Sequence, residues 1–366
     1  MSILRYFLLI VLISFIPQIF AQQINFSKSF LISASYVNKA ELSICKNNLK
    51  TAVNYYDSAF AIIKKPFTRD LFNYGLCEKK LGNHTKADSI FKLLYFENFK
   101  KQNLAWSFDT TKYYRLKQEE MVKYAEIFEE SARILKTDQL ADAAKFTDME
   151  NYLNTVLSNV HHIMNMVKNA EKDSLNLFSL DNSALYIPIA HFFQLWNISK
   201  ADSQFFKRWT IFSCIRNVDF KKYGVDDFLI EQTKKGNFDR RVLAHLFSMI
   251  GEKFGLRVVW QYNNKYLAVY YPNLFNKKLL SEINNDRKKF GLGVYSDYFI
   301  KIRYADSLLT NGKPFTVVTE TSENESAHHN STNFILAVGY RYSLGYHSDQ
   351  SAWNAYQQKM KEIEDK

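Results

Sequence analysis

The chain has 366 residues, and its 48 Lys and Arg against 37 Asp and Glu give a formal net charge of +11. Its 47% hydrophobic residues exclude an intrinsically disordered chain, and its 11 Gly and 5 Pro exclude a collagen-like or turn-dense all-β protein. Three cysteines are too few for a disulfide-stapled miniprotein. These exclusions leave a mainly α globular protein of roughly two or three domains.

Residues 1–21 have the three parts of a secretory signal peptide. Met1–Arg5 is a mildly basic start, Tyr6–Ile16 is almost entirely apolar, and the small Ala21 follows Pro17, so cleavage after Ala21 is expected. The alternative is an uncleaved anchor, although a membrane span needs about 20 apolar residues. No later stretch of the sequence reaches that length. The sequence therefore predicts a secreted or periplasmic protein without a transmembrane span after cleavage.

The positive charge comes from 36 Lys and only 12 Arg, and the lysines are scattered along the predicted helices. Recognition of nucleic-acid bases and phosphates relies strongly on Arg, whose planar guanidinium binds in two places at once. The pattern favours a solvated basic surface and no nucleic-acid partner. Weak attraction to acidic polymers or an anionic surface stays open.

Residues 29–96 contain two segments that align at a spacing of 35 residues. Small side chains at matching positions allow two antiparallel helices to approach closely, and an aromatic side chain fills the space beside them. This pattern resembles the tetratricopeptide (TPR) repeat and predicts TPR-like helical hairpins over 22–110. The alternative is an ordinary helical bundle, in which small residues also occur at helix crossings. The aligned pairs are Ala40 with Gly75, Ala52 with Ala87, and Tyr56 with Phe91.

The TPR resemblance implies that the first helix of each hairpin lines a concave face that binds a protein or peptide. It also implies that Cys45 and Cys77 lie on adjacent first helices, within range of a disulfide. The alternative is that the three cysteines are small buried hydrophobic residues. The face implied by the resemblance consists of Val37, Glu41, Ile44, Arg69, Phe72, Leu76 and Lys79.

Residues 111–254 are predicted to form a helical domain. Residues 111–136 and 147–172 are two long helices, the second with apolar residues at spacings of three and four. A further helix reaches Trp196, and Pro188 predicts a kink or a boundary within it. Another helix is expected to run from Asn237 to about residue 254.

Residues 255–366 are predicted to form a smaller α+β region. The arms 256–262 and 265–271 are rich in β-branched and aromatic residues and flank two Asn residues, a pattern typical of a β-hairpin. Helices are expected over 277–290 and 296–310. Two more strands are expected over 315–320 and 334–342.

A second, shorter set of fragments resembles secreted bacterial proteins in which a TPR-like segment precedes an uncharacterised helical region. The fragments are Lys222–Gly224, His245 within a helix, and Gly312–Pro314. The Gly-Thr-Gln ending expected from this resemblance is replaced by Val318–Glu320. The resemblance implies no chemistry.

The chain lacks the standard catalytic and cofactor motifs, including the zinc helix H-E-x-x-H, paired C-x-x-C cysteines, the phosphate loop and the G-x-S-x-G elbow. No cofactor is predicted. His161, His162 and Met166 are a weak candidate for copper, because adjacent helical histidines point about 100° apart and need further ligands. His245 lies among apolar residues and is either a core histidine or a catalytic base.

Two functions remain open. The favoured one is a non-enzymatic exported interaction or scaffold protein that binds a peptide or protein through a helical-repeat groove. The alternative is an exported hydrolase or ligand-binding enzyme with an unrecognised site around His245 and the tyrosine-rich strands.

Overall fold

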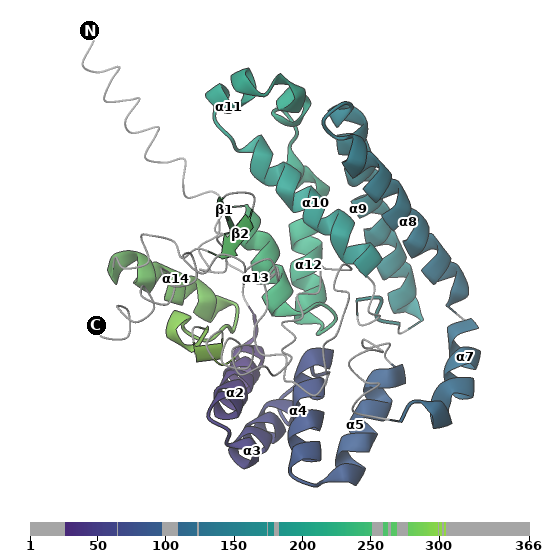
Figure 1. The fold of residues 1–366 in the computed structure, drawn as a ribbon, viewed down its shortest axis with the longest axis vertical. Helices are drawn as coiled ribbons and strands as arrows, with labels where there is room; N and C mark the ends of the chain where they lie inside the picture. The colour runs from purple at the N-terminus through teal and green to yellow at the C-terminus, as the bar shows by residue number, and fades with distance from the viewer. Residues whose placement is uncertain are drawn as a thin grey trace.

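The chain is mainly α-helical in the computed structural model (Figure 1). The helices are arranged as two hairpins, a group of long helices beside them, and a set of shorter helices that joins the two parts. The structure describes residues 26–63, 65–96, 109–122, 124–173, 175–178, 183–250, 259–262, 265–268, 277–298, 300–301 and 304.

Two helical hairpins begin the described chain. The two helices of each hairpin pack on each other, and the second helix of the first hairpin packs on the first helix of the second. The aligned residues of the two segments lie at these packing positions and are buried. The helices are α2 (Lys28–Cys45), α3 (Leu49–Phe60), α4 (Thr68–Lys80) and α5 (His84–Phe96).

The turns of the two hairpins have the same backbone hydrogen bonds at an offset of 35 residues. The amide of Asn48 donates to Ser43 O, and the amide of Asn83 donates to Glu78 O, both at 2.9 Å. Asn47 and Gly82, which precede these amides, both have positive φ angles, 56° and 85°. This left-handed conformation ends a helix most easily at Asn or Gly.

A long helical pair, α8 (Ala125–Ala144) and α9 (Met149–Lys172), packs with α10 (Ser183–Ser199). The prediction of one helix over 111–136 is wrong, because a short 3-10 turn, η2 (Thr111–Tyr113), and α7 (Tyr114–Val122) precede α8. Of the kink or boundary predicted at Pro188, the boundary is excluded, because Pro188 lies inside α10.

Shorter elements follow α10 and lead back towards the hairpins (Figure 1). Residues 203–215 form a short helix followed by a 3-10 segment. The two strands pair in antiparallel register, with Val259 opposite Ala268. The elements are α11 (Ser203–Arg208), η3 (Thr210–Ile215), η4 (Phe220–Tyr223), α12 (Val225–Lys234), α13 (Arg240–Met249), β1 (Val259–Tyr262), β2 (Lys265–Ala268) and α14 (Lys277–Lys289).

The described residues form two apolar cores. One lies within the hairpins, from Val37 to Tyr95, and the other lies between α8, α9, α10, α12 and α13. Ile283 and Phe290 of α14 and the following turn belong to the second core. The apolar core therefore continues past residue 254, where the sequence suggested a change of domain.

Several predicted features lie outside the described residues: the signal peptide 1–21, the strands 315–320 and 334–342, and the fragment Gly312–Pro314. Among the helices that the structure describes, none is both long and apolar enough to cross a membrane.

Candidate binding site

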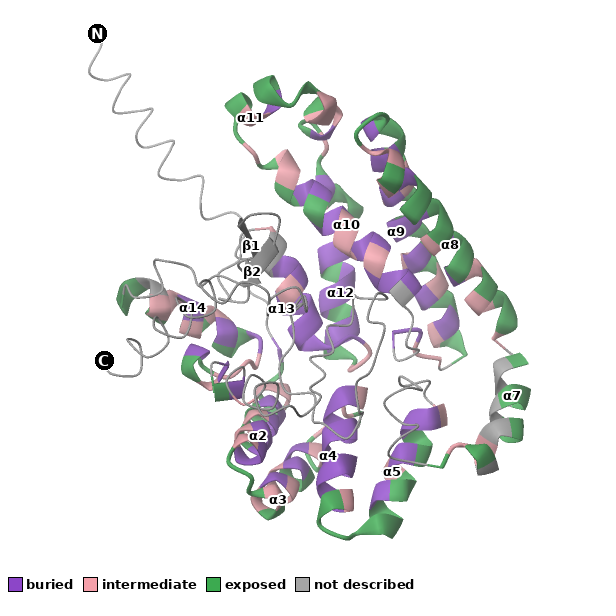
Figure 2. Cartoon of the chain, in the orientation of Figure 1, coloured by how far each residue is buried: buried purple, intermediate pink, exposed green. Residues whose placement is uncertain are grey.

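The hairpin face that the TPR resemblance implies is buried within the structure. Figure 2 shows α4, in the centre of this face, as almost entirely buried. The face therefore does not form an open groove in the part of the chain that the structure describes. Its buried members are Val37, Glu41, Ile44, Arg69, Phe72 and Leu76, and only Lys79 is partly exposed.

Part of what covers this face is a segment that follows α14, named here the 295–304 segment after its described residues Tyr295–Tyr298, Ile300, Lys301 and Tyr304. Asn38 Nδ2 of α2 donates to Asp297 Oδ2 at 2.7 Å, and Lys301 Nζ donates to Asn38 Oδ1 at 2.6 Å. Lys301 also forms an ion pair with Glu41. A segment more than 250 residues away in sequence thus lies against the first helix of the first hairpin.

Tyr304 extends this contact to the second hairpin. Its ring packs against the hairpin core, which includes Cys77 of α4 and against which Cys45 of α2 also packs. Burial raises the pKa of Tyr304, Cys45 and Cys77 to about 12 each. Both cysteines are free thiols in the structure, so the Cys45–Cys77 disulfide is not formed.

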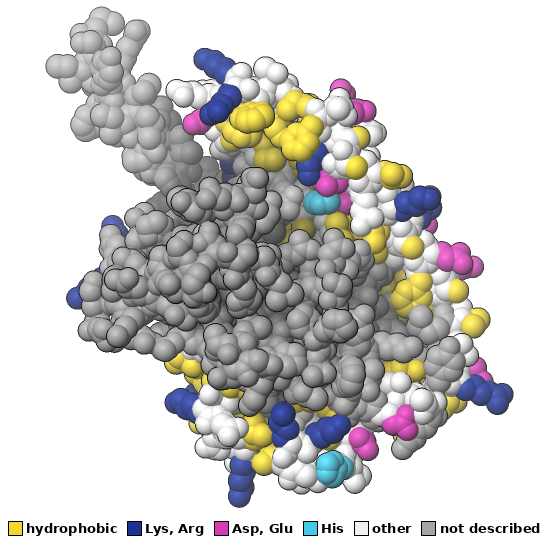
Figure 3. Space-filling view, in the orientation of Figure 1, with side chains coloured by type: hydrophobic (Ala, Val, Ile, Leu, Met, Phe, Trp, Pro, Cys, Tyr) yellow, Lys and Arg dark blue, Asp and Glu magenta, His cyan; other side chains and the backbone are white. Residues whose placement is uncertain are grey.

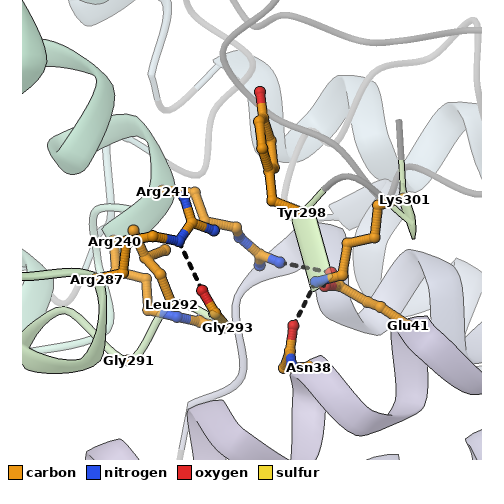
Figure 4. Close-up of a pocket in the computed structure, with 10 residues that line it drawn as sticks. All are labelled: Asn38, Glu41, Arg240, Arg241, Arg287, Gly291, Leu292, Gly293, Tyr298 and Lys301. Atoms are coloured by element: carbon orange, nitrogen blue, oxygen red, sulfur yellow. Dashed lines mark hydrogen bonds and ion pairs between the residues drawn. The ribbon is translucent and has the colours of Figure 1, made fainter. Parts of the chain in front are cut away.

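Arg241, near the start of α13, is the centre of a buried charged cluster on the same face. Its Nη1 donates to Glu41 Oε1 at 2.8 Å, its Nε donates to Asp239 Oδ1 at 3.1 Å, and its Nη2 donates to Asp70. Glu41 also accepts a hydrogen bond from Lys301 Nζ, so Arg241 and Lys301 both bind the same carboxylate (Figure 4). This cluster ties α2, α4, α13 and the 295–304 segment together.

Two carboxyl groups of this cluster, those of Asp70 and Asp239, have raised pKa values. Burial raises the pKa of Asp70 to about 7, with the charge of Arg240 opposing the shift and the nearby Asp239 and Glu41 adding to it. Burial also raises the pKa of Asp239, against the opposing charges of Arg69 and Arg240. Arg69 Nη2 lies 3.6 Å from Asp239 Oδ2. Such shifts show that these charges are held in a poorly solvated environment.

The suggested copper ligands His161, His162 and Met166 lie on α9, where Met166 packs against the core of the long helices. His161 and His162 are exposed on α9, and His162 Nε2 lies 2.7 Å from Glu130 Oε1. His162 and Glu130 border a polar groove of about 420 Å³ between α8 and α9. No group of three or more His, Cys, Asp or Glu side chains suited to a metal ion occurs within the described ranges.

Sequence reasoning missed a buried His–Asp pair in the long-helix group. His191 Nδ1 of α10 lies 2.7 Å from Asp138 Oδ2 of α8, and Asp138 is fully buried. Asn159 of α9 donates to the other oxygen of Asp138 at 3.4 Å. No motif connects residues 53 positions apart on different helices, so only the fold could reveal this pair. His245, the histidine that the sequence singled out, is half-buried on α13.

The basic residues of the surface are dispersed. On the face shown in Figure 3, the described Lys and Arg side chains are spread over several elements and form no single continuous patch. This distribution agrees with the solvated basic surface that the scattered lysines suggest.

No protein-family model, no curated protein and no solved structure matches the chain.

Proposed function

We propose that this protein is an exported interaction protein whose two hairpins are TPR-like and accept a peptide segment on the face formed by their first helices. The supporting observation is that the chain's own 295–304 segment already lies against this face. Its contacts combine a buried ion pair, side-chain hydrogen bonds and a packed aromatic ring, which are the usual components of peptide recognition.

The equivalence of the two hairpins supports a repeat over an ordinary bundle. Their turns share hydrogen bonds at an offset of 35 residues, and each hairpin packs a small residue against an aromatic one. In the second hairpin, a Cβ added at Gly75 would lie 2.7 Å from Phe91 Cε1, so glycine is needed for the close approach of α4 and α5.

The test uses the full chain and a labelled synthetic peptide with the sequence of residues 291–310. Lys301→Ala combined with Tyr304→Ala weakens the internal segment, and this double variant should bind the peptide about tenfold more tightly than the wild type. Adding Glu41→Gln should abolish most of that gain in affinity, because it removes the carboxylate with which Lys301 of the peptide would pair. Fluorescence anisotropy measures the affinities. A folded double variant that does not bind the peptide would contradict the proposal.

Export is tested separately by the mass of the protein recovered from its native cells. Removal of residues 1–21 should leave a mature chain that begins at Gln22. An intact N-terminus on a protein that remains in the cytoplasm would contradict export without affecting the proposed peptide face.

A further inference from the structure

A small cavity of about 30 Å³ lies between α2, α13, the turn after α14 and the 295–304 segment (Figure 4). Among the described residues, four cationic side chains and one acidic side chain, that of Glu41, line it. The four cations are Arg240, Arg241, Arg287 and Lys301.

The described lining of this cavity is mainly cationic. Its four cations are each at most 8% exposed, and its one described carboxylate, that of Glu41, already pairs with Arg241 and Lys301. A buried cavity lined mainly by cations attracts an anion.

Among the described residues, Arg240 has a buried guanidinium with free hydrogen-bond donors. Its side chain is 4% exposed, and it donates no hydrogen bond to any described residue. Its nearest carboxylate atom is Asp70 Oδ2, 3.7 Å from Nη1, which is too long for a hydrogen bond. Its guanidinium also lies 5.4 Å from the centre of the Phe67 ring. The neighbouring Arg241, by contrast, donates to three carboxylates. Two adjacent arginines thus have different roles: one joins the elements, and the other lines the cavity with unused donors.

Arg287 of α14 lines the same cavity. Its Nε donates to Gly293 O at 2.6 Å, and its guanidinium lies 5.1 Å from the centre of the Tyr298 ring. Gly291 has a φ of 66°, and a Cβ there would lie 2.7 Å from Ala34 Cβ of α2. The turn after α14 therefore lies close against α2 and closes one side of the site.

We propose that this cavity binds a phosphate group, either as inorganic phosphate or as the terminal group of a phosphomonoester. A phosphate carries about 1.5 to 2 negative charges at neutral pH, which suits a described lining in which cations outnumber carboxylates. The planar fork of Arg240 suits phosphate oxygens. One water molecule needs about 10–15 Å³, so the cavity admits a group of only a few atoms.

The test titrates the full-length protein with inorganic phosphate and, separately, with O-phosphoserine, at an ionic strength held constant with KCl. Calorimetry should show saturable binding of at least one of them. Inorganic phosphate binding shows that the free ion suffices, and binding of O-phosphoserine alone shows that the site needs a phosphomonoester. Saturable binding of neither overturns the proposal.

Two variants locate the binding. Arg240→Gln should weaken it by about tenfold or more, since a hydrogen bond to a charged group is lost. Arg216→Gln removes the same charge from an exposed position and should leave the affinity unchanged. Arg240→Lys keeps the charge and should retain part of the affinity, which separates loss of the site from loss of folding. Equal weakening by the Arg240→Gln and Arg216→Gln substitutions would overturn the assignment to this cavity.

Discussion

The long-helix group and the hairpin face are stabilised in different ways. In the long-helix group, α9 buries one apolar stripe, and the described buried polar side chains are few, with partners on neighbouring helices, such as His191 for Asp138. On the hairpin face, α4 buries Arg69 and Asp70 among its apolar residues, and their partners come from α13. The first region is fixed by apolar packing between helices close in sequence. The second depends on charges that distant parts of the chain bring together.

The largest expected effect tests this difference directly. Arg241→Met should lower the free energy of unfolding by about 3–5 kcal/mol, because it leaves three buried carboxylates without their shared partner. Urea denaturation followed by circular dichroism measures the change. The matched control is Arg133→Met, which breaks an exposed pair with Glu130 on the surface of α8 and should cost about 1 kcal/mol or less. Similar losses of unfolding free energy in both variants would contradict the view that the buried charges of the hairpin face contribute more to stability than an exposed ion pair.

A pH dependence should follow from Asp70. Its pKa in the folded state, about 7, lies above its value of about 3.9 in an unfolded chain. The folded state therefore holds this proton more strongly, so the stabilisation is complete below about pH 4 and is lost as the pH rises through about 7. Denaturation between pH 5 and pH 8 should show the wild type losing stability, and Asp70→Asn should lose less. An unchanged slope in Asp70→Asn would show that Asp70 is not the titrating group.

A smaller effect should come from the close approach of α4 and α5. Gly75→Ala should destabilise the protein by about 1–3 kcal/mol, because the new methyl group would overlap the Phe91 ring. Phe91→Leu should cost less in the Gly75→Ala background than alone, since the smaller side chain relieves the overlap. Additive losses in the double variant would mean that the two residues are not in tight contact.

The sequence predicted what depends on local spacing. The 35-residue repeat located both hairpins and their turns, and the apolar periodicity of residues 147–172 located α9 and its buried face. The end of α7 before Tyr124 was not predictable from helix-breaking residues, because no Gly or Pro lies in residues 111–136. There the start of α8 follows from packing against α9 and α10 rather than from a local signal.

The candidate site was predictable only in part. The sequence singled out Glu41 and Arg69, which are buried, but their partners Arg241, Asp239 and Lys301 lie about 170 to 260 residues further along the chain. The sequence alone contains no pattern that pairs charges at such separations, since the pairing results from tertiary packing. For the same reason the sequence described the face as open, whereas the structure covers it.

The central claim is that the 295–304 segment lies against α2 through Lys301 and Glu41. A double-mutant cycle with Glu41→Gln and Lys301→Met measures this contact directly, because it cancels the separate loss of the Glu41–Arg241 pair. We expect a coupling free energy of about 1–3 kcal/mol between Glu41 and Lys301. Losses that add to within about 0.5 kcal/mol would show that the two side chains do not meet and would contradict the account.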